Sequence, residues 1–439
     1  MAGDTIVAPA SGPPPSAICV IRISGPATRE ALYQLCGTQL RPRRLVRVTL
    51  REMERAVPLD EGLAVYFPGP DSFTGEDVGE LHVHGSRAVI DGVIDELCRL
   101  PDVRPSEPGE FSRRAFANGK LDLVQAEGIA DLVAAETRLQ RIQAIRQLQG
   151  GLSELYDSWR SRAIACLAEA EASLDFIDEA DVGSVALDPA KPRLLARDIA
   201  AHLDDDQRGE RLREGFRVAV LGPPNSGKSS LVNLLARREA AIVSSTAGTT
   251  RDIIEVHLSL GGWPITLADT AGIREAGDSI EREGIRRALN WAKQADVTVF
   301  LGDLSTDEES CVASTPARSL QVWNKSDLRS PARDPRVTND DVVISCRTGK
   351  GIDELLEALR AAVAAVGGHP EDGLALTRVR HRQALKRAAE ALRRAAQVET
   401  MELAAEELRA AVHALGRITG RVDVEDVLDR VFSSFCIGK

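Results

Sequence analysis

A glycine-rich stretch, GPPNSGKSS at 222–230, has residue types and spacing that suit phosphate binding. Its match to the pattern G-x-x-x-x-G-K-[ST] consists of Gly222, Gly227, Lys228 and Ser229. In such a loop the backbone N–H groups curl round the phosphates, the lysine faces the β and γ oxygens, and the serine can hold Mg²⁺. The alternating run FRVAVLG precedes the loop and the apolar run LVNLLA follows it. This strand–loop–helix context predicts a nucleotide site.

Contacts to the metal and the γ-phosphate are expected from two segments further along the chain. In AGTTRD, residues 247–252, Thr250 is the natural candidate to close over the metal. In DTAG, residues 269–272, Asp269 follows the apolar run ITLA, and an aspartate at a strand end can hold Mg²⁺ through water. The amide of Gly272 can meet the γ-phosphate. Each further element in this order weakens the alternative that the loop is a chance glycine turn.

Specificity for guanine is predicted by NKSD at 324–327, which closes the strand-like run QVWNKSD. Asp327 can accept both the N1 and the N2 protons of guanine, a bidentate match that adenine does not offer. By analogy with base readout in DNA, such a pair contributes on the order of 1–3 kcal/mol to discrimination. Ser345 and the amide of Cys346, in VVISCRTGKG, follow another strand and can reach the base. The order of the elements indicates GTP binding.

The residues expected to bind GTP belong to the phosphate loop and to the later segments. They are Asn225, Ser226, Gly227, Lys228, Ser229, Ser230, Ser244, Ser245, Thr246, Ala247, Gly248, Thr249, Thr250, Asp269, Thr270, Ala271, Gly272, Asn324, Lys325, Ser326, Asp327, Ser345, Cys346 and Arg347. Among them, the expected Mg²⁺ ligands are Ser229 and Thr250.

The residue that orients the attacking water is not obvious, because Ile273 follows DTAG where many GTPases keep a glutamine. The polar alternatives are a cation held by Asn225, the carboxylate of Glu281, and the arginines Arg251 and Arg274. From spacing alone, Glu281 is better explained as a solvated carboxylate at the start of a helix. The arginines are equally well explained as surface ion pairs, which are usually weak.

The elements that position these residues must form several domains, because 439 residues exceed what one hydrophobic core supports. Strand-like runs separated by turns predict a mixed α/β domain at the start of the chain. Proline is absent between Pro108 and Pro189 and again after Pro370, and apolar residues there recur at helical spacing. We expect these two segments to pack as one helical bundle, with Gly150 at a weak point and a self-contained domain inserted between them. The expected domains are 1–117, 118–213, 214–366 and 367–439.

The composition is that of an ordinary folded protein with an acidic surface. Hydrophobic residues make up 43% and charged residues 28% of the chain, close to the globular average. A net charge of −11 and an aromatic content of 4% disfavour unaided nucleic-acid binding, which would need a partner or a local patch. Seven scattered cysteines without a Cys-x-x-Cys pair encode neither a disulfide framework nor a zinc site, and they fit a reducing cytoplasm. No basic leader and no stretch of transmembrane length is evident, so no membrane association is expected.

The chain ends in FCIGK, and a cysteine four residues from a carboxyl terminus raises the question of prenylation. Prenylation favours aliphatic residues after the cysteine, whereas Gly438 and Lys439 fit poorly and no upstream basic cluster is present, so no lipid is expected. Cys436 has no histidine partner in sequence and is either a nucleophile or a packing residue. A helical stripe over 424–435, with Asp423 as a plausible N-cap, delivers this tail.

The whole chain resembles the MnmE (TrmE) family of bacterial tRNA-modification GTPases. The resemblance is carried by IRISGP, FTGEDVGELHVHG, PGEFSRRAFANGKLDL, GPPNSGKSS, AGTTRD, DTAGIRE, NKSD and the terminal CIGK. The GTPase motifs alone point to a superfamily, and the remaining motifs point to this family. The resemblance implies an N-terminal tetrahydrofolate-binding and dimerisation α/β domain, a discontinuous all-α helical domain and an inserted Ras-like P-loop G domain.

The resemblance further implies hydrolysis with potassium rather than an arginine finger. Where two G domains meet, K⁺ would be held by Asn225, Ser244, Thr246 and Thr249, although the family favours threonine in place of Ser244. Glu281 aligns with the family's water-positioning glutamate, which reverses the explanation from spacing. Arg274 and Cys436 remain candidate catalytic residues. A folate site is implied, in which a glutamate accepts from the pterin and basic groups meet the carboxylates, at Arg22, Glu80, Lys120 and Lys439.

The implied function is modification of tRNA together with the FAD-dependent partner MnmG. A homodimer would add an aminomethyl or carboxymethylaminomethyl group to C5 of the wobble uridine, with 5-formyl- or 5,10-methylene-tetrahydrofolate as the one-carbon source and most tRNA binding left to the partner. The alternative is a regulatory or ribosome-assembly GTPase switch without one-carbon chemistry. His82 and His84 share a strand face but lack an evident third ligand, so we expect ordinary strand histidines there.

Overall fold

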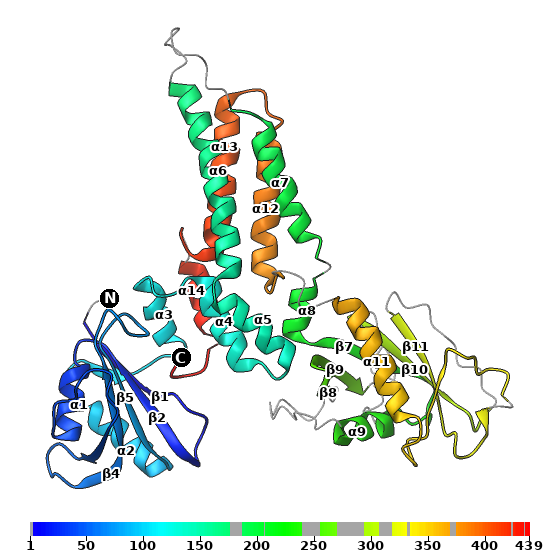
Figure 1. Ribbon diagram of the computed structural model, residues 1–439, viewed down its shortest axis with the longest axis horizontal. Coiled ribbons are helices and arrows are strands. Elements are labelled where there is room, and N and C mark those ends of the chain that lie inside the picture. Colours follow the sequence, from blue (N-terminus) through cyan, green and yellow to red (C-terminus); the bar gives the residue numbers. More distant parts are fainter. Residues whose placement is uncertain are drawn as a thin grey trace, which may run out of the picture. The chain divides into compact units, whose positions relative to one another are not determined.

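Contacts within the computed structural model divide the chain into two compact units. Figure 1 shows the helices and strands coloured along the sequence. The described residues are 3–175, 187–205, 207–238, 255–269, 294–306, 318–331, 334–368, 375–422, 425–433 and 435–439. Unit 1 comprises Met1–Ala130, Gln147–Ile164 and Val412–Lys439, and unit 2 comprises Asp131–Arg146 and Ala165–Ala411. Each unit contains one six-stranded sheet.

The sheet of unit 1 has the strand order β3-β4-β5-β2-β1-β6, in which β1 and β6 are parallel and the other neighbours are antiparallel. Its strands are β1 (Thr5–Pro9), β2 (Ser16–Ser24), β3 (Val46–Arg51), β4 (Pro58–Phe67), β5 (Val78–Gly85) and β6 (Val103–Pro105). The accompanying helices are α1 (Thr28–Cys36), α2 (Arg87–Leu97) and α3 (Glu110–Ala117). Ser86 caps α2, because its hydroxyl accepts a hydrogen bond from the amide of Val89.

Alternation along the strands gives this sheet two different faces. Ile21 and Ile23 of β2 lie in the core that α1 and α2 cover, whereas Arg22 between them projects from the opposite face. Glu80 of β5 is the register partner of Arg22 and therefore projects from that same face. A small cluster of Ile6, Ala8 and Phe111, with Phe73 packed against it, also lies away from the main core.

Helical segments precede and follow the second sheet. They are α4 (Leu123–Ala134), α5 (Arg138–Leu148), α6 (Gly151–Asp175), α7 (Ala190–Leu203), α8 (Arg208–Glu214), α12 (Val379–Ala395), α13 (Met401–Thr419) and α14 (Glu425–Phe432). In unit 2, α7 packs along α12 and Arg409 of α13 pairs with Glu171 of α6. In unit 1, Asp157 of α6 accepts hydrogen bonds from Thr419 and Arg421. The predicted packing between early and late helical segments is confirmed.

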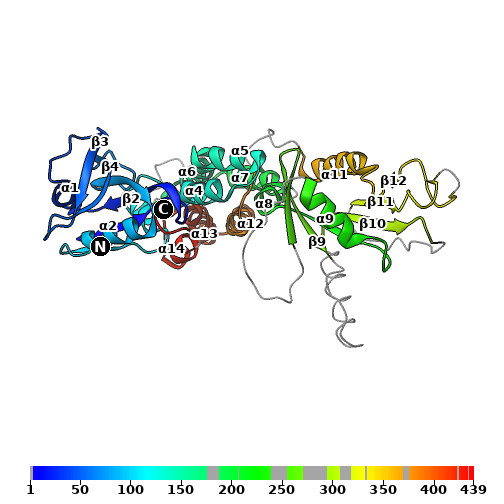
Figure 2. The same cartoon turned by 90° about the horizontal axis from the view of Figure 1, so that it is seen from below.

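The sheet of unit 2 has the order β12-β11-β10-β7-β9-β8, with β8 antiparallel to β9 and the other neighbours parallel. Figure 2 labels β9, β10, β11 and β12 of this sheet. Its strands are β7 (Phe216–Leu221), β8 (Glu255–Leu260), β9 (Trp263–Asp269), β10 (Val297–Asp303), β11 (Arg318–Asn324) and β12 (Val342–Val343). After β7 the chain forms β8 and β9 on one side of this strand and then crosses to β10 on the other side. The carboxyl ends of β7 and β10 therefore form a topological switch point. Ligands of open α/β sheets bind at such points.

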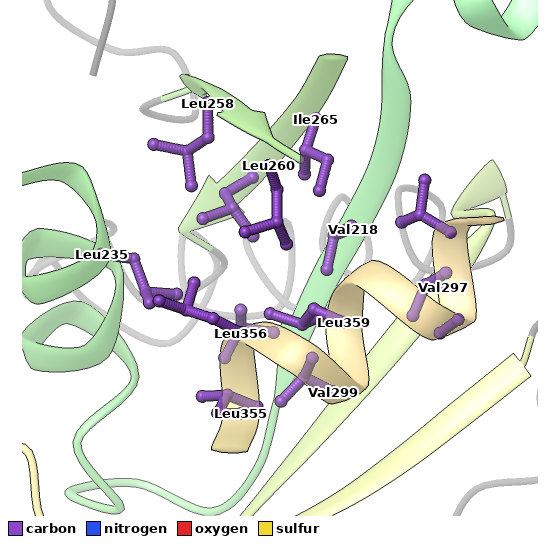
Figure 3. Packing of buried hydrophobic residues seen from close by; sticks show 14 of the residues in the cluster. Val218, Leu235, Leu258, Leu260, Ile265, Val297, Val299, Leu355, Leu356 and Leu359 are labelled. Atoms are coloured by element: carbon purple, nitrogen blue, oxygen red, sulfur yellow. The ribbon is translucent and has the colours of Figure 1, made fainter. Parts of the chain in front are cut away.

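Two helices, α9 (Lys228–Arg238) and α11 (Ile352–Gly367), pack on the second sheet. Figure 3 shows Leu235 of α9 and Leu359 of α11 gathered around Val218 and Val299 of the central strands. All four are nearly inaccessible to solvent. The strands are continuous apolar runs, because a parallel sheet is buried on both faces. The packing of α9 and α11 on the sheet fixes where the loops after β7 and β11 begin.

The expected weak point between the helices and the expected terminal helix can both be compared with the structure. Gly150, with a φ of 91°, separates α5 from α6, as predicted. The terminal helix ends at Phe432 rather than at 435, because the amide of Phe435 turns back to the Phe432 carbonyl. Asp423 lies outside the described residues. Within the described part of the chain, none of the helices combines the length and the apolar character needed to cross a membrane.

Candidate functional site

The predicted phosphate loop follows β7 and runs into the first turn of α9. Gly222 has a φ of 152° and Gly227 a φ of 101°. A Cβ on Gly222 would lie 2.2 Å from the carbonyl oxygen of Leu301, and one on Gly227 would lie 2.3 Å from Nδ2 of Asn324. The two glycines are therefore required by close neighbours as well as by backbone conformation.

The side chain of Lys228 donates hydrogen bonds to the backbone of its own phosphate loop. Its Nζ donates to the carbonyl oxygens of Gly222, at 3.0 Å, and Pro223, at 2.8 Å. Ser229 and Ser230 follow in the first turn of α9, whose amides and helix dipole favour an anion at this end. Asn225, with a φ of 60°, is exposed, and its side chain makes no hydrogen bond to any described residue.

Asn324 joins the phosphate loop to the expected base-binding segments. Its Nδ2 donates to the Ser226 carbonyl at 2.8 Å, and its Oδ1 accepts from the Cys346 amide at 3.0 Å. The side chain is only 3% exposed. A buried amide whose donor and acceptor are both used fixes the spacing of the segments it connects.

The carboxylate of Asp327 is exposed at the end of this segment, and one of its oxygens is held in place. The Ser345 hydroxyl donates to Oδ1 of Asp327 at 2.7 Å and accepts from the amide of Thr348. This arrangement orients the carboxylate and leaves it accessible to a ligand. Ser326 lies between the two segments, and its amide donates to the Ile344 carbonyl. Arg347 follows Cys346 in the same loop.

Asp303, at the carboxyl end of β10, is a neighbour of the site that the sequence analysis missed. Its Oδ2 pairs with Nζ of Lys325 at 2.5 Å, and its Oδ1 accepts from the amide and hydroxyl of Ser305. Burial by itself would raise the pKa of Asp303, but the hydrogen bonds from Lys325 and Ser305 outweigh it and the pKa is lowered. The sequence carried one signal for this residue, because Asp303 ends the strand that lies next to the NKSD strand.

Several predicted residues of the nucleotide site lie outside the described residues. They are Ser244, Ser245, Thr246, Ala247, Gly248, Thr249, Thr250, Thr270, Ala271, Gly272, Arg274 and Glu281. Asp269 is described as the last residue of β9, at the same sheet edge as the phosphate loop. The described part of the nucleotide site is thus the phosphate loop with the ends of β10, β11 and β12.

In unit 1, the predicted folate residues Arg22 and Glu80 form a partly buried pair. Nε and Nη2 of Arg22 donate to Oε1 of Glu80 at 3.2 and 3.0 Å. The guanidinium also lies over the rings of Phe73, at 5.3 Å, and Phe111, at 5.8 Å. An aromatic-lined cation with a carboxylate beside it suits a flat, polar heterocycle.

Lys120 and the C-terminal tail come to this unit from distant parts of the sequence. The aliphatic carbons of Lys120 lie 3.4 Å from where a Cβ on Gly75 would be, in the loop that carries Phe73. A Cβ on Gly438 would lie 2.2 Å from the carbonyl oxygen of Pro9, so the tail contacts the end of β1. Lys439 follows directly and is partly exposed, whereas Cys436 is exposed and is not part of the packed core.

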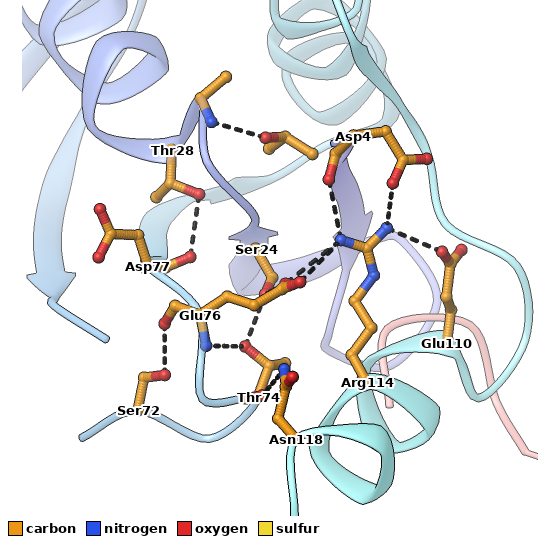
Figure 4. A network of polar contacts seen from close by, with 12 residues as sticks. Asp4, Ser24, Thr28, Ser72, Thr74, Glu76, Asp77, Glu110, Arg114 and Asn118 are labelled. Atoms are coloured by element: carbon orange, nitrogen blue, oxygen red, sulfur yellow. Dashed lines mark hydrogen bonds and ion pairs between the residues drawn. The ribbon is translucent and has the colours of Figure 1, made fainter. Parts of the chain in front are cut away.

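Figure 4 shows a polar network around Arg114 that holds in place the loop between β4 and β5, which carries Phe73. Arg114 donates to Glu76 in that loop, to Asp4 near the N-terminus and to Glu110 of α3. Burial would raise the pKa of Glu110, but the hydrogen bonds it accepts, above all from Arg104, lower it instead. The sequence analysis did not find this network, because its members are as many as 110 positions apart.

Each of the two strand histidines lies near a carboxylate. His84 is exposed, and its Nδ1 is 2.8 Å from Oδ1 of Asp60. His82 lies closer to the centre of the strand, with Nε2 at 3.6 Å from Oε2 of Glu80. No group of three or more His, Cys, Asp or Glu side chains that could hold a metal ion occurs among the described residues.

Comparison with known proteins shows matches over nearly the whole chain. A family model described as "GTP-binding protein TrmE N-terminus" matches residues 5–120, and one described as "MnmE helical domain" matches residues 123–436. The tRNA modification GTPase MnmE of Parvibaculum lavamentivorans is 50% identical over 99% of this chain and 100% of its own length. Its counterpart in Rhodospirillum rubrum is 49% identical over 100% of both chains.

Among solved structures, a variant of Era from Aquifex aeolicus bound to GDP and aluminium fluoride is 26% identical. The alignment covers 40% of this chain and 66% of that protein, with a TM-score of 0.28. At that score the structural likeness supports no conclusion, and the assignment rests on the sequence relatives and the family models.

Proposed function

Because the chain belongs to the MnmE family of tRNA modification GTPases, and is therefore a GTP hydrolase that binds GTP and Mg²⁺, we propose a more specific function for it. It is a potassium-dependent GTPase that works as a homodimer with an FAD-dependent MnmG partner. Together they add an aminomethyl or carboxymethylaminomethyl group to C5 of the wobble uridine of certain tRNAs. The one-carbon unit comes from a tetrahydrofolate, and the GTP cycle drives a conformational change.

The observation that carries the one-carbon part of this proposal is the convergence of distant residues in unit 1. Arg22 and Glu80 pair across neighbouring strands under two aromatic rings. Lys120 lies against the loop that supplies one of those rings, and Gly438 places Lys439 beside the end of β1. Cations and a carboxylate collected beside the partly buried ring of Phe73 fit a pterin with a carboxylate tail.

Titration of the purified chain with 5-formyltetrahydrofolate tests this assignment. We expect micromolar binding that is lost in Arg22→Ala and in Glu80→Ala. Arg47→Ala is a matched control, because Arg47 makes an exposed ion pair with Glu61 on the same sheet. Absence of binding by the unaltered chain would instead favour a regulatory or ribosome-assembly GTPase switch without one-carbon chemistry.

The potassium part of the proposal rests on Asn225. Its exposed side chain stands in the phosphate loop without a hydrogen bond to a described residue, so it is available to a cation. A bound K⁺ would stabilise developing charge much as an arginine finger does, an effect worth roughly 10³–10⁵ in rate. The remaining ligands would be Ser244, Thr246 and Thr249, with Glu281 orienting water.

Comparing GTP hydrolysis in potassium and in sodium tests the cation. Hydrolysis should be faster in potassium, and both Asn225→Ala and Glu281→Ala should lower the rate in potassium. Equal rates in the two salts would refute the potassium mechanism while leaving the family assignment intact. Arg274→Ala and Cys436→Ser separate the two further candidate catalytic residues: Arg274→Ala is read in GTP hydrolysis, and Cys436→Ser in tRNA modification with the partner present.

Partner dependence follows from the charge of the chain. A net charge of −11 and an aromatic content of 4% leave little to attract or stack RNA, so tRNA binding falls mainly to the partner. Electrophoretic mobility shift of tRNA should therefore require MnmG at physiological salt. Tight tRNA binding by this chain alone would contradict the division of labour.

A further inference from the structure

His82 carries a buried polar atom that no described residue satisfies. Its Nε2 is inaccessible to solvent and makes no hydrogen bond, although the whole side chain is 28% exposed. Leaving a buried nitrogen unpaired is unfavourable, so its position calls for an explanation. In the sheet, His82 pairs with Val20 on one side and Leu63 on the other, and neither side chain offers a hydrogen bond.

The atom lies beside the proposed folate carboxylate. Oε1 of Glu80 accepts both hydrogen bonds from Arg22, whereas Oε2 accepts none from the described residues. Nε2 of His82 is 3.6 Å from that Oε2, which is too long for a hydrogen bond. An imidazole nitrogen and a carboxylate oxygen therefore stand side by side on one face of β5, and neither atom has a hydrogen-bond partner among the described residues.

We propose that His82 is a specificity-determining residue of the folate site, which recognises the 4-oxo group of the pterin. This assignment rests on the proposed folate function. The pterin edge presents the N3–H donor next to the O4 acceptor. Oε2 of Glu80 accepts from N3–H, and Nε2–H of His82, which a rotation of the partly exposed ring uncovers when the pterin binds, donates to O4. Both the neutral tautomer protonated at Nε2 and the imidazolium ion can donate from this atom.

The pairing excludes a 4-amino pteridine. An amino group at position 4 donates where O4 accepts, so the Nε2–H of His82 would face another donor. A site built to hydrogen-bond one group rejects the analogue that lacks it, because its own polar atoms are then left unpaired. The same exchange removes the N3–H donor, so Oε2 of Glu80 also loses its partner, and the share of the discrimination that belongs to His82 is the share lost in His82→Leu.

Folic acid and aminopterin differ in this oxo-for-amino exchange and are the probes. The unaltered full-length chain should bind folic acid at least about 10-fold more tightly than aminopterin, measured by calorimetry. In His82→Leu, folic acid affinity should fall about 10-fold and the ratio should fall with it, leaving only the preference that Glu80 supplies through N3–H. In His82→Gln, whose amide can donate, part of the ratio should return. The comparison of folic acid with aminopterin on the unaltered chain requires no variant. For His82→Leu and His82→Gln, thermal unfolding checks that the fold is stable.

His84→Leu is the matched control, because His84 is exposed on the same strand face and pairs with Asp60. It should leave the ratio unchanged. If the unaltered chain binds both compounds without preference, or if His82→Leu keeps the preference undiminished, the role of His82 is refuted while the folate site stands. If the unaltered chain binds neither compound nor 5-formyltetrahydrofolate, the folate function itself is refuted and the role of His82 falls with it.

Discussion

Replacing Gly438 by alanine should displace the C-terminal tail without unfolding the protein. Gly438 has a φ of 92°, and an added Cβ would lie 2.2 Å from the Pro9 carbonyl oxygen and 2.9 Å from Cα of Ala10. Both neighbours are backbone atoms of the β1 end, so neither can rotate away. The left-handed conformation alone costs an alanine about 1–2 kcal/mol, and the clash adds to it. That cost corresponds to roughly a 5- to 30-fold shift away from the docked tail.

The expected result is weaker folate binding by about that factor with an unchanged thermal unfolding midpoint. Stability is spared because the last core residue, Phe435, precedes the change and remains packed with Phe432. A second readout needs no ligand: a carboxypeptidase specific for basic termini should release Lys439 faster from the variant. Gly37→Ala is the control, because Gly37 has a φ of 66° but nothing within 4 Å of the added Cβ.

The control separates backbone strain from displacement of the tail. Gly37→Ala should lower stability slightly and leave both folate affinity and the release of Lys439 unchanged. Unaltered folate affinity and unaltered release in Gly438→Ala would refute the idea that contact with β1 positions the tail. Lost folate affinity with normal release would mean that the alanine acts on the site by another route.

Two further predictions concern unit 2. Asn324→Ala leaves the Ser226 carbonyl and the Cys346 amide without partners. Fluorescent GDP should therefore bind more weakly, and the free energy of unfolding in urea should fall by about 1–3 kcal/mol. Asn339→Ala, at an exposed position, is the control, and equal effects of both substitutions would contradict the connecting role of Asn324. Hydrogen bonds from Arg336 lower the pKa of Asp334 to about 2. Because this folded-state pKa lies below the unfolded value of about 4, the pair stabilises the protein above that pH and the contribution is lost as the pH falls towards 2. The unfolding midpoints of the unaltered chain and Asp334→Asn should therefore differ at neutral pH and converge in acid, and a gap that is constant with pH would exclude this linkage.

Local sequence patterns predicted most of the elements that hold the nucleotide site. The alternating run before the phosphate loop is β7, the runs joined by Gly261 and Gly262 are β8 and β9, and the apolar run VTVFLGD is β10. These predictions succeeded because buried parallel strands are short apolar runs and because glycine marks turns. The expected domain boundaries stay predictions, since contacts divide the chain into two units that each include helical segments.

Side-chain partners across strands could not be predicted in the same way. The pairing of Lys325 with Asp303 depends on β10 and β11 lying next to each other in a set register. The approach of His82 to Glu80, and the absence of a hydrogen bond between them, depend on rotamers that no periodicity reveals. The Arg114 network joins α3, the Phe73 loop and Asp4, which are brought together only by the folded sheet.

The sequence by itself determined the chemistry that this protein can perform, because the motif residues, their spacing and their family resemblance are properties of the chain. Tertiary structure alone decided which of those groups stand within bonding distance. Strand register brought Glu80 to Arg22, and the left-handed turn at Gly438 set the tail against β1. The physical reason is that hydrogen bonds and steric contacts act over a few ångströms, whereas the residues that make them are separated by much of the chain.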